Sequence, residues 1–166
     1  MILNSLDDAN KWGSRYYDDW LKALTVDERE AITIYTGSDY KKINSYLRGF
    51  SDNLEGVDPK VIDNLNSALG KANVPYDMVV YRGTDFAPFK KLLDVDEFGR
   101  IDYNSLVGKT INDKAFVSTA LLEDASFSNM QVAWKINVPA GADAAYVAKL
   151  SKYPNEAELL FSWLGL

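Results

Sequence analysis

Apolar side chains recur at three- and four-residue intervals through the first seventy residues, which is the spacing of amphipathic helices. Four such segments precede Pro75, so we expect four helices there. The fourth opens with Asp58-Pro59, an acidic N-cap followed by proline at the first helical position. In the first segment the apolar residues form one face that we expect to pack into the core. That face consists of Leu6, Ala9, Trp12, Tyr16, Trp20 and Leu24.

Capping residues predict where the middle helices begin and end. Thr25 followed three residues later by Glu28 is a capping-box pattern, which predicts the start of the second helix. We expect that helix to end at Gly37 and the third helix to begin with Ser38 as its N-cap. Gly49 is the expected exit from the third helix, in a left-handed conformation.

From Tyr76 onward the pattern changes to short runs rich in β-branched and aromatic residues, which predict strands. The expected strands span residues 78–83, 115–119, 132–138 and 144–147, with a turn at 139–142 between the last two. Residues 85–109 are mixed and suggest a short helix at 88–93. Helices followed by strands predict an α+β fold, with N-terminal helices packed on a mixed, mainly antiparallel β-sandwich.

The length of 166 residues predicts a single domain, with a helical part (residues 1–74) and a β-rich part (residues 75–166). The chain has no histidine and no cysteine, which excludes a serine-histidine triad, a cysteine nucleophile, a zinc finger and disulfides. Any acid-base chemistry therefore falls to carboxylates, tyrosines or lysines. The net charge of -6 disfavours nucleic acid as a partner.

The apolar runs are far shorter than the ~20 residues that span a bilayer, so we expect no membrane span. The first residues turn acidic at once and lack the basic and apolar regions of a signal peptide. We therefore expect a soluble domain, which is compatible with being one part of a longer protein.

Three short motifs carry the candidate chemistry. Glu156 and Glu158 lie two residues apart before an apolar run, so their carboxylates should share a face if Glu158 begins a strand. Arg82 and Gly83 end the first expected strand, where a fixed charge beside a flexible residue suits a phosphate. Ser118 follows in another strand and can orient a neighbouring carboxylate. Taken singly, the glutamate pair also fits a solvated strand face, the arginine a surface ion pair, and the serine a strand-end cap.

The order of these motifs resembles the mono-ADP-ribosyltransferase exoenzymes of the Arg-Ser-Glu class, especially the enzymatic components of binary toxins and the Rho-modifying exoenzymes. An arginine ends the first strand, a Phe-x-Ser-Thr strand follows about 35 residues later, and a Glu-x-Glu motif about 40 residues after that. The segment from Ile32 to Arg48 is similar to the helix that packs over the NAD site in that family. The resemblance extends from about Leu24 to Phe161.

This resemblance implies an NAD-dependent transferase that releases nicotinamide and modifies a protein. Glu158 would stabilise the positive charge of the sugar in the transition state, and Ser118 would hold Glu158 in position. Glu156 implies arginine as the acceptor, because a carboxylate can attract a guanidinium and take its proton; glutamine there accompanies transfer to asparagine. The residues implied for NAD are Arg82, Gly83, Asn44, Arg48, Thr119 and Phe127, and Tyr153 is implied for target recognition.

Two departures from the family pattern qualify the resemblance. Ala120 stands where the family has the last serine of Ser-Thr-Ser, which implies a retuned site. Relatives continue beyond the Glu-x-Glu strand with another strand, so the chain is either truncated or closes its sheet differently. Phe127 fits a ring that packs on nicotinamide and equally fits a core residue at the start of the next strand.

Three alternatives remain open from the sequence: an NAD glycohydrolase at the same site, a non-catalytic adaptor or binding domain of the same fold, and an unrelated α+β domain. NAD is the implied substrate, and no metal is implied because the reaction needs no Lewis acid. The target could be actin, a small GTPase or a bacterial protein. The resemblance further implies a monomer that is secreted or delivered into a target cell, alone or within a larger toxin.

Overall fold

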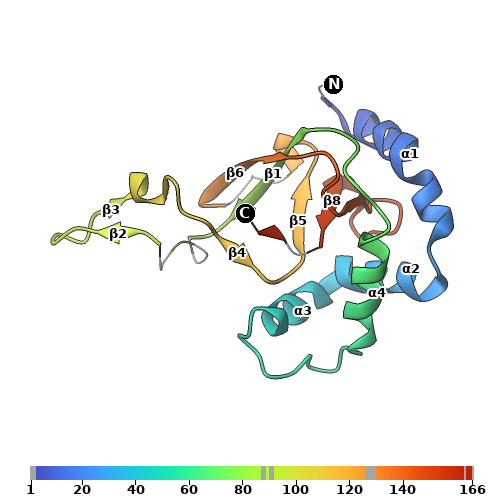
Figure 1. Ribbon diagram of the computed structural model, residues 1–166, viewed down its shortest axis with the longest axis horizontal. Coiled ribbons are helices and arrows are strands. Elements are labelled where there is room, and N and C mark those ends of the chain that lie inside the picture. Colours follow the sequence, from blue (N-terminus) through green and yellow to red (C-terminus); the bar gives the residue numbers. More distant parts are fainter. Residues whose placement is uncertain (1–2, 87–88, 90–91, 126–129, 163, 166) are drawn as a thin grey trace.

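The computed structural model describes residues 3–86, 89, 92–125, 130–162 and 164–165. Four α-helices come first and the strands follow, as expected (Figure 1). Residues 88, 90 and 91 of the expected helix at 88–93 lie outside the described residues. The helices are α1 (Leu6–Ala23), α2 (Val26–Ile34), a π-helical turn (Tyr35–Asp39), α3 (Tyr40–Leu47) and α4 (Lys60–Leu69), with 3-10 turns at Tyr103–Leu106, Glu123–Ala125 and Pro154–Glu156.

Five strands form the central sheet in the order β6-β1-β5-β8-β7, and each neighbouring pair is antiparallel. Two smaller antiparallel pairs, β2-β3 and β4-β9, complete the described strands. The β2-β3 hairpin projects from the body of the molecule (Figure 1). This arrangement confirms the α+β fold class. The strands are β1 (Met78–Thr84), β2 (Asp94–Val95), β3 (Ile101–Asp102), β4 (Asn112–Asp113), β5 (Val117–Ala120), β6 (Val132–Val138), β7 (Ala144–Tyr146), β8 (Glu158–Phe161) and β9 (Leu164–Gly165).

The last described residues form a strand of their own. Leu164 in β9 pairs with Asp113 in β4, and Gly165 pairs with Asn112. The backbone beyond the Glu-x-Glu motif therefore closes against β4, a strand that sequence periodicity did not predict because it is only two residues long.

The capping box at the start of α2 is confirmed. The Thr25 hydroxyl accepts a hydrogen bond from the backbone N–H of Glu28, and the Glu28 carboxylate accepts one from the N–H of Thr25. The same carboxylate is buried and lies 2.5 Å from Nζ of Lys71 and 2.7 Å from the hydroxyl of Ser67. This cluster ties α2 to the end of α4.

The break expected at Gly37 is present, because the backbone of this residue leaves helical geometry (φ -82°, ψ -133°) at a kink within the π-helical turn. The expected N-cap is not Ser38: among the described residues Asp39 precedes α3, and it makes no side-chain capping bond. The kink lets α2 continue directly into α3 while Tyr35 and Thr36 stay buried. Gly49 has a φ of 74°, as expected for the exit from α3.

The apolar face of α1 packs into the core largely as expected, with one exchange. Tyr17 is 2% exposed, and its hydroxyl donates a hydrogen bond to the carbonyl of Asn73. Tyr16 is 38% exposed, and its ring packs against the ring of Trp12. Trp20 is buried and its indole N–H donates to the carbonyl of Ala68. The face is therefore the expected one except that Tyr17 takes the place of Tyr16 in the core, where the hydrogen bond to Asn73 satisfies its buried hydroxyl.

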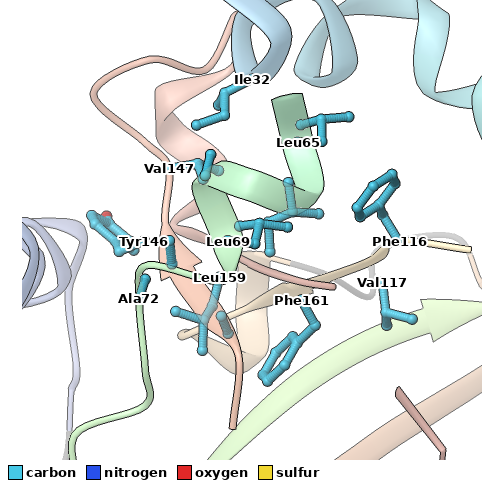
Figure 2. Packing of buried hydrophobic residues seen from close by; sticks show 14 of the residues in the cluster. Ile32, Leu65, Leu69, Ala72, Phe116, Val117, Tyr146, Val147, Leu159 and Phe161 are labelled. Atoms are coloured by element: carbon cyan, nitrogen blue, oxygen red, sulfur yellow. The ribbon is translucent and has the colours of Figure 1, made fainter. Parts of the chain in front are cut away.

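The main core lies between the helices and the central sheet. Figure 2 shows Leu65 and Leu69 of α4 and Ile32 of α2 close to side chains of β5, β7 and β8. Leu159, Leu160 and Phe161 in β8 are fully buried, so this strand is covered on both faces. Burial on this scale fixes β8 and, with it, the position of Glu158 at its first residue. Among the described helices, none is long and apolar enough to cross a membrane.

Candidate active site

A pocket of about 740 Å³ lies between the α2–α3 segment and the ends of β1, β5 and β8. Nine of the ten residues implied for the site line this pocket. Phe127, the tenth, lies outside the described residues. The lining residues from that set are Asn44, Arg48, Arg82, Gly83, Ser118, Thr119, Tyr153, Glu156 and Glu158.

The register of three strands fixes the floor of the pocket. Ala120 in β5 pairs with Tyr81 in β1 on one side and with Glu158 in β8 on the other. Residues that pair directly across antiparallel strands project from the same face, and so does Ser118, two residues before Ala120. The strand positions therefore bring Ser118 and Glu158 to one face of the sheet.

Glu158 is only 4% exposed. The pKa of Glu158 is raised to about 7, mainly by burial and also by the nearby charge of Glu156, while the hydrogen bond with the Ser118 side chain and the charge of Arg82 act in the opposite direction. The buried carboxyl therefore holds its proton to a higher pH than an ordinary glutamate does. A carboxyl group with a pKa in this range is typical of active sites.

Arg82 is held at the pocket by the backbone of β5. Its Nη1 donates a 2.8 Å hydrogen bond to the carbonyl of Ser118. Burial lowers the pKa of Arg82, although a guanidinium keeps its charge at any physiological pH. One hydrogen bond uses one of five N–H donors, so the remaining donors can serve an anionic ligand.

Arg48 is fixed by an ion pair that the sequence did not reveal. Its Nε lies 2.8 Å from Oδ1 of Asp113, and its Nη2 lies 2.6 Å from Oδ2. This hydrogen-bonded contact raises the pKa of Arg48. Both side chains are about a quarter exposed. The pair orients the guanidinium at the pocket wall and leaves three of its N–H donors for a ligand.

Asn44 belongs to a buried hydrogen-bond network with Tyr35 and the backbone of β5. Its Nδ2 donates to the Tyr35 hydroxyl at 2.9 Å and to the Phe116 carbonyl at 3.3 Å. Its Oδ1 is buried and has no partner among the described residues. A phosphate needs donors, and the amide nitrogen of Asn44 is already engaged. The fold therefore holds the Asn44 side chain in place at the pocket, and its expected phosphate contact stays a prediction.

Thr119 is likewise engaged by the fold. Its buried hydroxyl donates a 2.8 Å hydrogen bond to the carbonyl of Leu159 in β8. The hydroxyl thus joins β5 to β8 beside Glu158, and the place in NAD binding that the resemblance implied for Thr119 stays a prediction.

Glu156 and Tyr153 reach the pocket from a loop. Glu156 ends a 3-10 turn, and Ala157 follows in the left-handed conformation before β8 begins at Glu158. Glu158 begins a strand as the expectation required, but Glu156 lies in the turn before it, so the two glutamates are not on one strand and the expected shared strand face is not formed. Glu156 is exposed whereas Glu158 is buried, yet both line the pocket. Partial burial raises the pKa of Glu156.

The loop before Glu156 is tied to the helical segment. The backbone N–H of Lys152 donates to the Thr36 hydroxyl, and the Thr33 hydroxyl donates to the Leu150 carbonyl. These bonds hold Tyr153, which is 56% exposed, at the mouth of the pocket.

Several lining residues were missed by the sequence analysis. Tyr35, Tyr40, Lys41 and Phe50 come from the α2–α3 segment and its exit. Lys41 adds a third cation to Arg48 and Arg82. Side chains three or four residues apart lie on one face of a helix. Tyr40 and Lys41 have this spacing from Asn44, and Arg48 follows Asn44 by four residues, so the sequence could have indicated that Tyr40 and Lys41 belong to the site.

The profile of the ADP-ribosyltransferase exoenzyme family matches residues 9–162 of the chain. The chain therefore belongs to the ADP-ribosyltransferase exoenzyme family, as the resemblance implied. This membership confirms the expected enzyme class, ADP-ribosyltransferase.

Relatives of known name support the same class. Mono-ADP-ribosyltransferase C3 of Clostridium botulinum C phage is 25% identical over 169 residues, which cover 94% of this chain and 68% of that protein. NAD(+)--arginine ADP-ribosyltransferase EFV of Enterococcus faecalis is 24% identical over 152 residues, which cover 87% of this chain and 29% of that protein.

A solved structure extends the similarity to the fold. The crystal structure of BECa, an ADP-ribosylating toxin of a binary enterotoxin of C. perfringens, was determined with NADH. It is 31% identical to this chain and superposes with a TM-score of 0.78, over 96% of this chain and 41% of that chain. This chain thus corresponds to about two thirds of the C3 relative and to less than half of the two larger proteins.

Proposed function

We propose that this chain transfers ADP-ribose from NAD to an arginine side chain of a protein and releases nicotinamide. The observation that carries the proposal is the buried Glu158 carboxyl, which hydrogen-bonds Ser118 and shares one pocket with Arg82 and Glu156. In addition, BECa binds a nicotinamide dinucleotide, and it has 31% sequence identity to this chain.

In the first half of the reaction the bond between the nicotinamide nitrogen and the ribose carbon breaks. The electron pair leaves with nicotinamide, and the ribose becomes oxocarbenium-like. The ionised Glu158 stabilises this positive charge in a buried setting, where the attraction is stronger than in water. Arg82 and Arg48 hold the two phosphates, each through N–H donors that the fold leaves free.

In the second half a nitrogen of the acceptor guanidinium attacks the ribose carbon and forms the new bond. Glu156 takes the proton that this nitrogen loses. Its exposed place at the pocket mouth suits a group that meets a side chain of another protein. Burial raises its pKa, which improves it as a base. EFV, named as an arginine transferase, supports this choice of acceptor.

The test combines labelled NAD with a host-cell lysate and measures both nicotinamide release and label on protein. Glu158→Gln should abolish both, whereas Glu156→Gln should keep nicotinamide release and lose transfer to protein. Glu97→Gln, at an exposed glutamate that does not line the pocket, is the matched control and should change neither.

Other outcomes would correct the proposal in distinct ways. Nicotinamide release without label on any protein would identify an NAD glycohydrolase. Mass spectrometry that places the label on asparagine would overturn the arginine acceptor alone. Isothermal titration that shows no heat with NAD would favour a non-catalytic binding domain.

A further inference from the structure

Phe50 is an aromatic residue whose side chain is exposed to solvent at the edge of the pocket. It is 80% exposed and it lines the same pocket as Arg48, two residues before it. Among the described residues its ring packs on no other aromatic ring. A single exposed aromatic is common on protein surfaces, so its place relative to the pocket is what makes it informative.

The backbone that carries Phe50 is fixed by two hydrogen bonds. The N–H of Phe50 donates to the Ser45 carbonyl at 2.8 Å, and the N–H of Gly49 donates to the Tyr46 carbonyl at 2.9 Å. With Gly49 at a φ of 74°, this is a Schellman motif at the end of α3. Such motifs commonly pack the residue at this position against the helix, but Phe50 faces solvent and the pocket. The helix end thus presents the ring at a defined place.

The positions of the charged and aromatic side chains along the pocket indicate which part of a bound dinucleotide the Phe50 ring would contact. Glu158 is buried at the floor, where the bond to nicotinamide would break, and Phe50 is exposed at the rim. The phosphates of a dinucleotide lie between its two bases. If Arg48 holds the phosphates, the second base emerges beyond Arg48, toward the next exposed residues of the same helix end.

The other exposed aromatics of the rim are less suited to this base. Tyr40 already packs against Tyr35 at 6.3 Å, and Lys41 lies over its ring. Tyr153 precedes Glu156 in the loop that faces the acceptor protein in the proposed reaction. Phe50 therefore offers an aromatic face that stacks on no other ring of the described residues, next to the arginine that we propose holds the phosphates.

We infer that Phe50 is a binding residue for the adenine of NAD and stacks against its ring. The inference rests on the proposed function, since it takes NAD as the ligand. Stacking of a nucleobase on an aromatic side chain contributes to affinity without hydrogen bonds. Phe50 takes no part in bond breaking, so its loss should raise KM and leave kcat nearly unchanged.

The experiment measures binding by isothermal titration with three probes: NAD, ADP-ribose and nicotinamide mononucleotide, which lacks the adenine half. Phe50→Ala should weaken NAD and ADP-ribose by roughly 5- to 100-fold, from the usual effect of removing a stacking ring. The affinity for nicotinamide mononucleotide should stay the same. Phe50→Trp should retain wild-type affinity for all three probes.

Phe98→Ala is the matched control, because Phe98 is 74% exposed and does not line the pocket. It should bind every probe as the wild type does. Unchanged thermal unfolding of Phe50→Ala should accompany the binding data, since an exposed ring contributes little to stability.

If Phe50→Ala bound NAD and ADP-ribose with wild-type affinity, the inference about Phe50 would be overturned and the proposed function would stand. If that variant also lost transfer to protein while it kept NAD hydrolysis, the ring would contact the acceptor protein instead. If Phe50→Ala also bound nicotinamide mononucleotide more weakly by the same factor, the inference would be overturned too, because the substitution would then have distorted the whole pocket. A wild-type protein that bound no NAD would overturn the proposed function itself, and the role of Phe50 with it.

Discussion

Arg48 in α3 and Asp113 in β4 form a two-point ion pair, with contacts of 2.8 Å and 2.6 Å between their nitrogen and oxygen atoms. Asp113 pairs in turn with Leu164 of β9, so the last described strand supports the residue that orients Arg48. Planar, two-point contacts of this kind fix a guanidinium in orientation as well as in place. The wall of the pocket is therefore joined to the end of the chain.

Asp113→Asn should weaken NAD binding and leave kcat nearly unchanged. Asparagine keeps the shape but turns one acceptor into a donor that faces Nη2, so Arg48 loses its fixed orientation. Both side chains are only about a quarter exposed, so we also expect a loss of about 1–3 kcal/mol in the free energy of unfolding. Steady-state kinetics and urea unfolding measure the two effects.

Asp96→Asn is the control for this prediction. Asp96 pairs with Arg100 at 2.7 Å, but the pair lies on an exposed hairpin, where such contacts contribute little. NAD binding that becomes tighter in Asp113→Asn would contradict the prediction, and would show that Asp113 competes with the phosphates for Arg48.

Much of the site could be predicted because its residues lie on strands with clear patterns. Arg82, Ser118 and Glu158 belong to motifs whose order along the chain resembles that of the family, and antiparallel pairing of β1, β5 and β8 brings these three strands together at one pocket. The core of β8, which is apolar at each of its last three positions, fixes Glu158 at the edge of the buried sheet.

The partners of these residues could not be predicted, because they come from distant parts of the sequence. Asp113 lies 65 residues from Arg48, and the Phe116 carbonyl lies 72 residues from Asn44. Periodicity and capping patterns report contacts within one helix or strand only. The turn before Glu158 was missed for a related reason, since nothing in the local pattern indicates a left-handed alanine at Ala157.

The activity of the free enzyme should rise as pH increases through about 7. Burial raises the pKa of Glu158 to about 7, and the ionised form is the one that stabilises a cationic sugar. Ala120→Ser should move this rise to lower pH, because Ala120 pairs with Glu158 and a hydroxyl there can donate to the carboxylate. The pH profile of kcat/KM for nicotinamide release measures both effects, and identical profiles would contradict the role given to Ala120.

Glu158 should also make the protein less stable at high pH. Its pKa is about 7 in the folded state and 4.5 in the unfolded state, so the folded state binds the proton more tightly between these values. This stabilisation is complete below about pH 4.5 and is lost as pH rises to about 7. Glu158→Gln stays neutral, and should exceed the wild type by on the order of 3 kcal/mol at pH 8.

Urea unfolding at pH 5 and pH 8 tests this prediction. The two proteins should differ little at pH 5, and the gap should open toward pH 8. Glu97→Gln, at a solvated carboxylate, is the control and should follow the wild type at both values. A constant gap between Glu158→Gln and the wild type would show that the substitution acts through packing and not through ionisation.

Gly13→Ala should destabilise the protein, although alanine is the better helix former. A Cβ at position 13 of α1 would lie 2.0 Å from the ring of Tyr146 in β7, which cannot move freely because it is 3% exposed and its hydroxyl donates to Asn10. Overpacking of this kind costs about 1–3 kcal/mol, which outweighs the gain of about 1 kcal/mol in helix propensity. Urea unfolding of the single variant measures the net loss.

A double-mutant cycle separates the two contributions at this contact. Tyr146→Ala removes the ring and is destabilising by itself, because it leaves a cavity beside Trp12. In that background Gly13→Ala meets no ring, so only the helix propensity remains and the substitution should stabilise the protein by up to about 1 kcal/mol. The effect of Gly13→Ala should therefore change sign between the two backgrounds. An equal loss in both would show that the close approach of α1 to β7 does not explain the glycine.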